Sequence, residues 1–430
     1  MTTDRCCVMS GSGPSNWGGN VVFGMAGAVS PGSVEEVARI VRDAGRGGVR
    51  AAGTGHSFSP VGDTEGLMVS LRELPRVCEP VVGDRDDVVG ARIGGGLTYG
   101  EICPAIDGWG RALPVLGSLP HISFGGGCAT ATHGSGWGNG CVAAGVDEVM
   151  MVVGDGSLVR VGHGDPGFDG TVVSLGALGV AVEFIVQVVE SFQVEQFVFE
   201  GLPFPVLTER LEEVLGAGYS VSVFWPLGPV ADVWVKRKAG DEWWDLSGTG
   251  AVPARAHRHP VAGLPAVNCT PQLGLCGPWF ERLPHFRAEF APATGHEIQS
   301  EYLVAAADGA RALEAVARIE TDLAPVLQTV EVRSVAGDRC WLSPAFGRDS
   351  VALHFTWLPD PGAVDAAVNR VEEAIGPMRA RPHWGKVFGM DPATVADLYP
   401  RWDDFRGLLD EYDPEGKFRN AMIDRFFPAA

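Results

Sequence analysis

Apolar residues recur at the spacing of a helix face in the segment SVEEVARIVRDAG (33–45), where Val37 and Val41 lie one turn apart. Three- and four-residue spacing places apolar side chains on one side of a helix. Ser33 begins the segment and Glu36 follows three residues later, which is the spacing of a capping box at a helix N-terminus. The sequence therefore predicts an amphipathic helix here.

Short apolar runs and a second capping box continue the N-terminal half. GVRAAG (48–53) has the length and composition of a buried strand, and Thr98 with Glu101 repeats the capping box in GGGLTYGEICPAI (94–106). DEVMMVVGDGSLVRV (147–161) has the pattern of a hairpin with a Gly-Asp-Gly turn. These elements together predict an α+β domain.

The pattern changes near residue 191, where aromatic residues and prolines become more frequent and a domain boundary is predicted. Two further amphipathic helices are predicted at 308–327 and 361–376, the second with Val364 and Val371 on one stripe. Strands are expected between them. The C-terminal half is therefore predicted to be a second α+β domain, an antiparallel sheet covered by helices on one face.

Length and charge narrow the possible functions. A chain of 430 residues is expected to form about two or three domains. With 33 basic and 53 acidic residues, the net charge of -20 argues against partners such as nucleic acid or an anionic membrane surface. A neutral or cationic small-molecule substrate remains compatible with this charge.

The N-terminal segment MTTDRCCVMSGSG (1–13) lacks the apolar core of a secretory signal, and no apolar run in the chain has the length of a membrane span. A soluble cytoplasmic protein is the expectation. The nine cysteines include no C-x-x-C pair and are expected to be mostly buried free thiols. No metal site is expected, and the H-x-H pair of His257 and His259 is interpreted as part of a solvated loop.

Two glycine-rich segments are candidates for close backbone contact with a ligand. RAAGTGHSFSP (50–60) has neither the G-x-G-x-x-G fingerprint nor a P-loop lysine, yet its backbone N–H groups could form an anion nest. An ordinary strand-to-helix turn is the alternative. The segment 117–140 is also rich in glycine and almost uncharged, which suits a backbone that wraps around a ligand.

Polar pairs on two predicted strands are candidates for chemistry. Glu331 and Arg333 alternate in TVEVRSV, and His354 and Thr356 alternate in SVALHFTWLP, so each pair projects from one face of its strand. An ordinary half-solvated sheet with a cross-strand ion pair is the alternative. Lys386 stands in an aromatic segment where burial could lower its pKa, although a surface lysine that extends to water fits the same pattern.

Five motifs in a fixed order resemble those of the alditol oxidases and aldonolactone oxidases of the vanillyl-alcohol-oxidase flavoprotein superfamily. The motifs are RAAGTGHSFSP, SLPHISFGGGCATATHGSG, EVRSV, ALHFTW and PHWGK. The resemblance extends from SNWGGN near the start to DPEGKFRN near the end. The segment around Cys128 and the cap segment 259–279 cannot be matched to the family pattern, which leaves the substrate open.

The resemblance implies an α+β fold with a two-subdomain FAD-binding domain, residues 1–190 completed by 382–430, and an α+β cap domain, residues 191–381. It implies that His56 carries FAD covalently through the 8α-methyl carbon of the flavin. The residues expected to contact the cofactor are Gly53, Thr54, Gly55, His56, Ser57, Phe58, Ser118, His121, Gly127, Thr130, His133, Gly134 and Val180.

The same resemblance implies roles in the active site. Glu331 and Arg333 are expected to bind substrate hydroxyls, with Ser118 and Thr356 as further polar contacts. His354 and Lys386 match the residues nearest the reacting alcohol. Oxidation of an alcohol requires a base for the O–H proton, and His354 is our candidate. Lys386 is expected to stabilise the developing alkoxide, or else to share the proton.

The expected activity is oxidation of a primary alcohol of a polyhydroxylated small molecule to the aldehyde, with hydride transfer to flavin N5 and reoxidation by oxygen to give hydrogen peroxide. The alternative enzyme is a flavin dehydrogenase of a sugar, lactone or amino sugar that uses another electron acceptor. The alternative that is not an enzyme is a flavin- or sugar-binding protein without catalytic activity.

Overall fold

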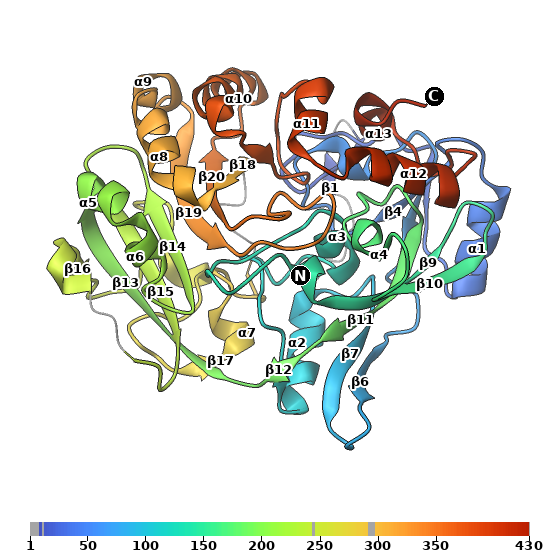
Figure 1. Ribbon diagram of the computed structural model, residues 1–430, viewed down its shortest axis with the longest axis horizontal. Helices are drawn as coiled ribbons and strands as arrows, with labels where there is room; N and C mark the ends of the chain where they lie inside the picture. The colour runs from blue at the N-terminus through green and yellow to red at the C-terminus, as the bar shows by residue number, and fades with distance from the viewer. Residues whose placement is uncertain (1–7, 11–12, 243–245, 291–296, 430) are drawn as a thin grey trace.

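The computed structural model describes residues 8–10, 13–242, 246–290 and 297–429. Most of the segment 1–13, including Cys6 and Cys7, lies outside these ranges. Within them, no helix is both long and apolar enough to cross a membrane. The fold is mixed helix and sheet in two parts (Figure 1). Residues of both parts line one cavity.

A small parallel sheet opens the N-terminal part. Its strand order is β3 (Gly27–Val29), β5 (Leu67–Ser70) and β4 (Val49–Ala52). The predicted first helix is α1 (Val34–Asp43), where the Ser33 hydroxyl accepts a hydrogen bond from the Glu36 N–H at 3.2 Å. Val37 and Val41 are fully buried beneath this helix, which confirms the amphipathic pattern.

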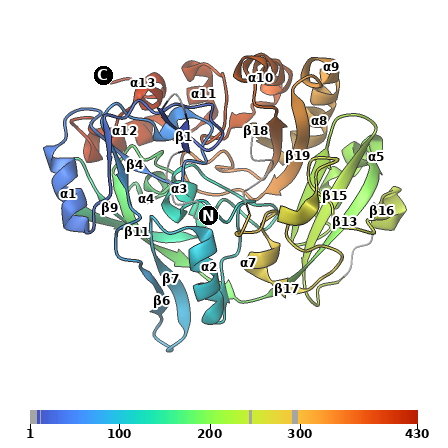
Figure 2. The same ribbon diagram turned by 180° about the vertical axis from the view of Figure 1, so that it is seen from behind.

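A five-stranded antiparallel sheet forms the second layer of this part. Its members, in order, are β10 (Leu158–Gly162), β9 (Val146–Val152), β11 (Val180–Gln187), β7 (Val88–Gly94) and β6 (Cys78–Val82). Strands β9 and β10 are the predicted hairpin, and Gly156 in its turn has φ +81°. Helix α2 (Tyr99–Gly108) begins with the predicted capping box of Thr98 and Glu101. Figure 2 shows the β6–β7 hairpin extending away from the rest of the molecule.

A nine-stranded sheet forms the C-terminal part, and all its pairings are antiparallel. The path runs through β16 (Val252–Pro253), β13 (Gln193–Pro203), β15 (Val230–Lys238), β14 (Ser220–Trp225), β19 (Leu327–Val335), β20 (Ser350–Trp357), β18 (Ile298–Ala305) and β21 (Arg381–Pro382), with β17 (Gly277–Pro278) beside β13. The predicted antiparallel sheet is therefore present.

Helices cover one face of this sheet, as predicted (Figure 1). They are α5 (Phe204–Glu209), α6 (Leu211–Leu215), α8 (Gly309–Ala317), α9 (Glu320–Leu323) and α10 (Pro361–Ile375). The single helix predicted over 308–327 is wrong, because the chain turns at Ile319 and continues as the separate helix α9. Ile319 lies in this break, and β-branched residues are weaker helix formers than alanine or leucine.

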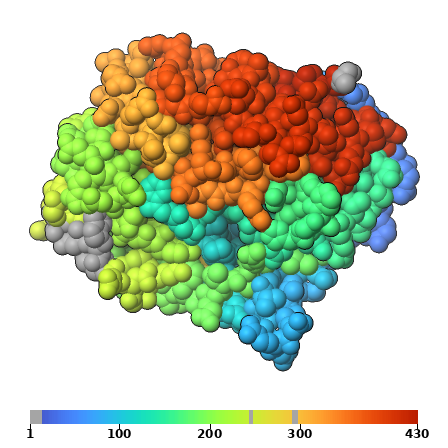
Figure 3. All heavy atoms as spheres, viewed as in Figure 1, coloured from blue at the N-terminus to red at the C-terminus, as the bar shows by residue number. Residues whose placement is uncertain are grey.

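The C-terminal segment returns to the N-terminal part. Helices α11 (Pro392–Leu398), α12 (Trp402–Tyr412) and α13 (Ala421–Phe426) join the same hydrophobic core as strands β7, β9 and β11. In Figure 3 these red residues lie directly against green residues of the middle of the chain. The return also reaches the first glycine loop, because the Phe58 N–H donates to the Gly385 carbonyl at 2.7 Å and the Ser59 hydroxyl to the Trp384 carbonyl at 2.5 Å.

A buried arginine ties three distant segments together. Arg50 on β4 is 2% exposed, and its guanidinium donates to the carbonyls of Phe418 at 2.6 Å, Gly176 at 3.1 Å and Leu175 at 2.5 Å, and to that of Val61. Burial lowers the pKa of Arg50 to about 10, so the group stays charged at neutral pH. Buried carbonyls that lose their only donor are costly.

We expect Arg50→Met to lower the free energy of unfolding by about 3 kcal/mol or more, because it leaves several buried carbonyls without a donor. Chemical denaturation followed by tryptophan fluorescence measures this. Arg39→Met is the matched control, since Arg39 lies exposed on α1, where it forms a surface ion pair with Glu36 at 3.5 Å. Equal stability of the two variants would contradict the structural role of Arg50.

Candidate active site

The two parts enclose a cavity of about 260 Å³. Both glycine-rich segments line one side, and the helix-free face of the nine-stranded sheet lines the other. Most residues proposed from the sequence line this single cavity. They are Gly53, Thr54, Gly55, His56, Ser57, Phe58, Ser118, Gly127, Thr130, His133, Glu331, Arg333, His354, Thr356 and Lys386.

Three proposed cofactor residues lie outside the lining. His121 is half-buried, its ring centroid is 6.4 Å from that of His56, and its Nε2 bonds to the Ala288 carbonyl at 3.0 Å. The side chain of Val180 is buried in the core beneath α1, whereas its neighbours Gly179 and Ala181 line the cavity. At Gly134, an added Cβ would lie 2.4 Å from a backbone oxygen, so the close packing there requires glycine.

The glycine segments form a cradle that suits a large flat cofactor. An added Cβ at Gly53 would lie 2.9 Å from the Ser123 hydroxyl and 3.9 Å from the Cα of Gly126, and one at Gly126 would meet the same hydroxyl at 2.8 Å. The two backbones therefore approach each other with no room for a side chain between them. Exposed backbone of this kind binds phosphate oxygens through its N–H groups, so these residues fit the pyrophosphate of FAD.

His56 stands between two aromatic rings at the edge of the cradle. The Trp17 ring is stacked on one side, with a centroid separation of 5.8 Å, and His121 lies on the other side. His56 Nδ1 is 3.0 Å from the Thr54 hydroxyl. Burial lowers the pKa of His56 to about 3, so the imidazole is neutral at physiological pH and keeps a nitrogen lone pair.

Three adjacent strands place polar side chains in rows on the cavity face of the sheet. Glu301 on β18, His354 on β20 and Glu331 on β19 are direct cross-strand partners. One step along the strands, Thr356 lies between Gln299 and Thr329 in the same way. Residues two apart on a strand share a face, so each strand supplies two polar groups to the cavity.

A buried chain of groups leads away from Glu331. His285 Nε2 is 2.8 Å from the Glu331 carboxylate, and His285 Nδ1 is 3.0 Å from the Lys236 amine. Burial lowers the pKa of Lys236 to about 7 and that of His285 to about 4. Burial favours a neutral Glu331, but Arg333 and His285 outweigh it and hold the Glu331 pKa well below its usual range. An ionised carboxylate only accepts hydrogen bonds, so Glu331 presents acceptors to the cavity.

Lys386 approaches the cavity from the segment after β21. Its amine donates a hydrogen bond to the side-chain oxygen Oε1 of Gln299 and lies 5.2 Å from the centroid of the Phe58 ring. Burial lowers the pKa of Lys386 to about 8. The alternative interpretation of Lys386, a surface lysine that extends to water, therefore does not describe this residue.

Two buried donors on the cap face have no hydrogen-bond partner among the described residues. They are the Thr329 hydroxyl and the Arg333 Nε, and both residues line the cavity. The Arg333 Nε also lies 3.5 Å from a Glu331 carboxylate oxygen, in an ion pair without the alignment of a hydrogen bond. Buried polar groups that stay unpaired cost about 1–3 kcal/mol each. A ligand with several hydroxyl groups would satisfy them, whereas an apolar ligand would not.

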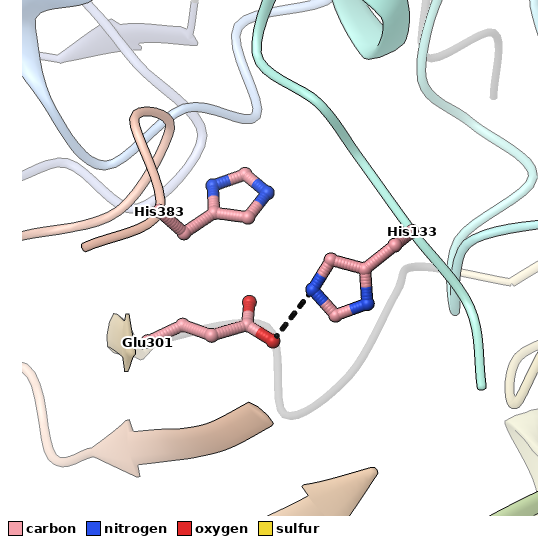
Figure 4. Close-up of side chains that lie close together, drawn as sticks. All are labelled: His133, Glu301 and His383. Carbon is pink, nitrogen blue, oxygen red and sulfur yellow. Dashed lines mark ion pairs between the residues drawn. The ribbon is translucent and has the colours of Figure 1, made fainter. Parts of the chain in front are cut away.

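Three buried side chains, His133, Glu301 and His383, have ligand atoms within 4.8 Å of one another, as a cation site would require (Figure 4). The Gly385 N–H donates to His383 Nδ1 at 3.1 Å, so a neutral ring carries its proton on Nε2 and offers no second lone pair. Glu301 Oε1, which lies 3.1 Å from His133 Nε2, is also 2.5 Å from the Arg333 guanidinium. The arrangement is that of an ion-pair network rather than of a metal centre.

Several cavity residues were not found by sequence reasoning. Glu301, Gln299 and Thr329 belong to strands whose apolar residues dominate the pattern, although Gln299 and Glu301 repeat the two-residue spacing of Glu331 and Arg333. The interpretation of the H-x-H pair as a solvated loop is wrong for His259, which is 8% exposed and lines the cavity.

Comparisons with known proteins agree with this architecture. The FAD binding domain model matches residues 25–162, and the D-arabinono-1,4-lactone oxidase model matches residues 295–426. A cholesterol oxidase from B. sterolicum has the same fold, with a TM-score of 0.74 over 96% of both chains at 16% identity. The matched cofactor domain, the fold and the glycine cradle define an FAD-dependent oxidoreductase with the fold of the vanillyl-alcohol-oxidase type.

Sequence relatives refine this class. The chain is 46% identical to the alditol oxidase of a Streptomyces species over 95% of this chain and 97% of the relative. It is 28% identical to the L-gulono-1,4-lactone dehydrogenase of Mycobacterium tuberculosis over 96% and 98% of the two chains. The chain belongs to the alditol oxidase family.

Proposed function

We propose that this protein oxidises a primary hydroxyl of an alditol-like polyol to the aldehyde and passes the electrons to oxygen. The observation that carries the substrate class is a pair of buried donors with no hydrogen-bond partner among the described residues, the Thr329 hydroxyl and the Arg333 Nε, beside the ionised Glu331. Each buried hydroxyl of a polyol needs a partner, and this face offers both donors and an acceptor. The 46% identity to an alditol oxidase supports the same substrate class.

In this proposal, Glu331 and Arg333 bind the substrate hydroxyls, Thr356 and Ser118 add polar contacts, and the alcohol carbon is held against the cradle. FAD held there would supply the hydride acceptor, at its N5, and the route by which two electrons pass to oxygen to give hydrogen peroxide. His354 takes the hydroxyl proton. Burial lowers the pKa of His354, so its ring is ready to accept a proton at neutral pH. The Lys386 ammonium stabilises the negative charge that develops on the alcohol oxygen.

We also propose that a ring nitrogen of His56 holds the flavin covalently at the 8α carbon. The neutral imidazole supports this role, because its lone pair can form the bond. With FAD in the cradle, the new C–N bond would replace one hydrogen of the 8α-methyl group and the N–H hydrogen of the imidazole, and oxygen would take up the two protons and two electrons as hydrogen peroxide. The remaining cradle residues proposed from the sequence, including His121, Gly134 and the backbone at Val180, would contact the rest of the cofactor.

The proposed domain division is residues 1–190 with 382–430 as the flavin-binding unit and 191–381 as the cap. Support comes from the largest hydrophobic core, which joins side chains of the first segment to α11, α12 and α13. A few cap residues, such as Trp279 and Trp341, also reach this core.

The deciding experiment is anaerobic stopped-flow reduction of the purified protein by a panel of alditols and aldonolactones, followed by mixing with aerated buffer. We expect alditols to bleach the flavin absorbance and oxygen to restore it rapidly. Reduction only by lactones would contradict the substrate class. Reoxidation that is slow in air but fast with a quinone would favour a dehydrogenase, the activity named for the mycobacterial relative.

A further inference from the structure

Glu301 is a buried carboxylate to which the proposed mechanism has given no role. It lies in the middle of β18 and is 2% exposed. One oxygen, Oε1, is 2.5 Å from an Arg333 nitrogen and 3.1 Å from His133 Nε2, the latter without the alignment of a hydrogen bond. The other oxygen, Oε2, is 3.1 Å from His354 Nδ1. The two oxygens therefore serve different partners.

Glu301 is ionised in this setting. Burial favours the neutral acid, but Arg333, His133 and His354 together hold the pKa of Glu301 well below its usual range. An ionised carboxylate only accepts hydrogen bonds. Its contact at 3.1 Å therefore requires that His354 carry a proton on Nδ1.

This requirement fixes the other nitrogen of the same ring. A neutral imidazole has one N–H and one lone pair, so a proton on Nδ1 leaves the lone pair on Nε2. A general base needs that lone pair to reach the substrate hydroxyl. His354 lines the cavity between Glu301 and Glu331, where a polyol would lie.

We propose that Glu301 is the positioning residue of this active site, which sets the tautomer of His354 and at the same time anchors the guanidinium of Arg333. This inference rests on the proposed function, because it assigns His354 as the base. The carboxylate is suited to both tasks since each oxygen accepts from a different donor. A glutamine would present one acceptor and one NH₂ group, so either Arg333 or His354 would face a donor.

The electrostatic surroundings of His354 come from two strands and two loops. The charged groups that act on it are Glu301 on β18, Glu331 and Arg333 on β19, and Lys386 after β21. His383, also after β21, and His133, in the second glycine segment, line the same cavity. Among them Glu301 acts on the pKa of His354 in the upward direction, against burial, Lys386 and Arg333. Removing the Glu301 charge should therefore lower this pKa further.

The test is nitrogen NMR of the flavin-loaded protein labelled with ¹⁵N-histidine, with the His354 signal assigned by its loss in His354→Gln. We expect wild-type His354 to be the Nδ1–H tautomer. The spectrum of the wild-type protein is sufficient to determine this tautomer. In Glu301→Gln we expect the His354 titration midpoint to fall by about one pH unit or more, as for loss of an adjacent opposite charge. The rate constant of flavin reduction by an alditol should fall at least about tenfold.

Glu372→Gln is the matched control. Glu372 on α10 accepts a hydrogen bond at 2.6 Å from Tyr302, the residue after Glu301, on the face of β18 away from the cavity. We expect neither the His354 signal nor the reduction rate to change in this variant. A wild-type His354 with its proton on Nε2, or a midpoint that is unchanged in Glu301→Gln, would overturn the proposal.

The two readouts separate this inference from the proposed function. If alditols fail to reduce the wild-type flavin while the His354 tautomer and its shift in Glu301→Gln are as expected, the substrate assignment is wrong and the positioning role stands. If alditols reduce the wild type and the Glu301→Gln variant equally well, the positioning role is wrong and the function stands.

Discussion

Lys386→Met is expected to lower the rate constant of flavin reduction by an alditol by about 10²-fold or more, because it removes the charge proposed to stabilise the developing alkoxide. The flavin itself should stay bound, since the Lys386 amine bonds to the Gln299 side chain on the cap sheet and the cradle backbone at Gly53 and Gly126 is unchanged. Anaerobic stopped-flow absorbance measures both quantities. Lys238→Met is the matched control, because Lys238 lies 4.3 Å from the Phe192 ring centroid, outside the cavity lining.

The pH dependence of the same reaction distinguishes the two roles considered for Lys386. Burial lowers its pKa to about 8, so the amine is an ammonium below that pH and neutral above it. If the ammonium stabilises the alkoxide, the reduction rate falls as pH rises through about 8, and Lys386→Met loses this dependence. A rate that instead rises through this range would make Lys386 the base and would displace His354 from that role.

His56→Ala should abolish covalent attachment, so that no flavin absorbance remains on the chain after acid precipitation. The cradle around Gly53 and Gly126 is unchanged by this substitution, and FAD should still bind without a covalent bond. Covalent attachment generally raises the reduction potential of a flavin, so we also expect a lower potential and a slower reduction by alditols. Spectroscopy of the precipitated chain and a redox titration measure the two effects.

His121→Ala separates attachment from packing. The His121 ring stacks beside His56 at a centroid separation of 6.4 Å, so this variant disturbs the surroundings of His56 but leaves its nitrogen in place. We expect flavin to remain covalently bound in it. Flavin that stays attached in His56→Ala and is lost in His121→Ala would show that the attachment residue has been misassigned.

Local patterns predicted the elements whose signals are complete within a few residues. The capping boxes at Ser33 and Thr98 and the apolar stripe at Val364 and Val371 correspond to α1, α2 and α10. The break at Ile319 was missed because the apolar spacing continues through it, although the chain turns there. The pairing of β19 with both β14 and β20 depends on distant strands and is not encoded in any short pattern.

The residues of the candidate site also fall into two groups, those that a local pattern predicts and those that depend on contacts between distant strands. Alternation predicted that Glu331 and Arg333 share a face, and the resemblance to known oxidases indicated which face matters. The pattern could not predict that Glu301 would lie beside His354, because the two residues are neighbours only through the β18–β20 register. Lys236 and His285 were also missed, since their link to Glu331 exists only after the cap sheet has folded.

The return of the C-terminal segment has a consequence for the synthesis of the protein. Arg50 bonds to the Phe418 carbonyl, and the first glycine loop bonds to Gly385 and Trp384. A nascent chain lacks these partners until residues 384–418 have been synthesised. The native pocket is thus completed only once this segment has left the ribosome, and FAD is expected to be loaded after that point rather than onto the isolated N-terminal segment.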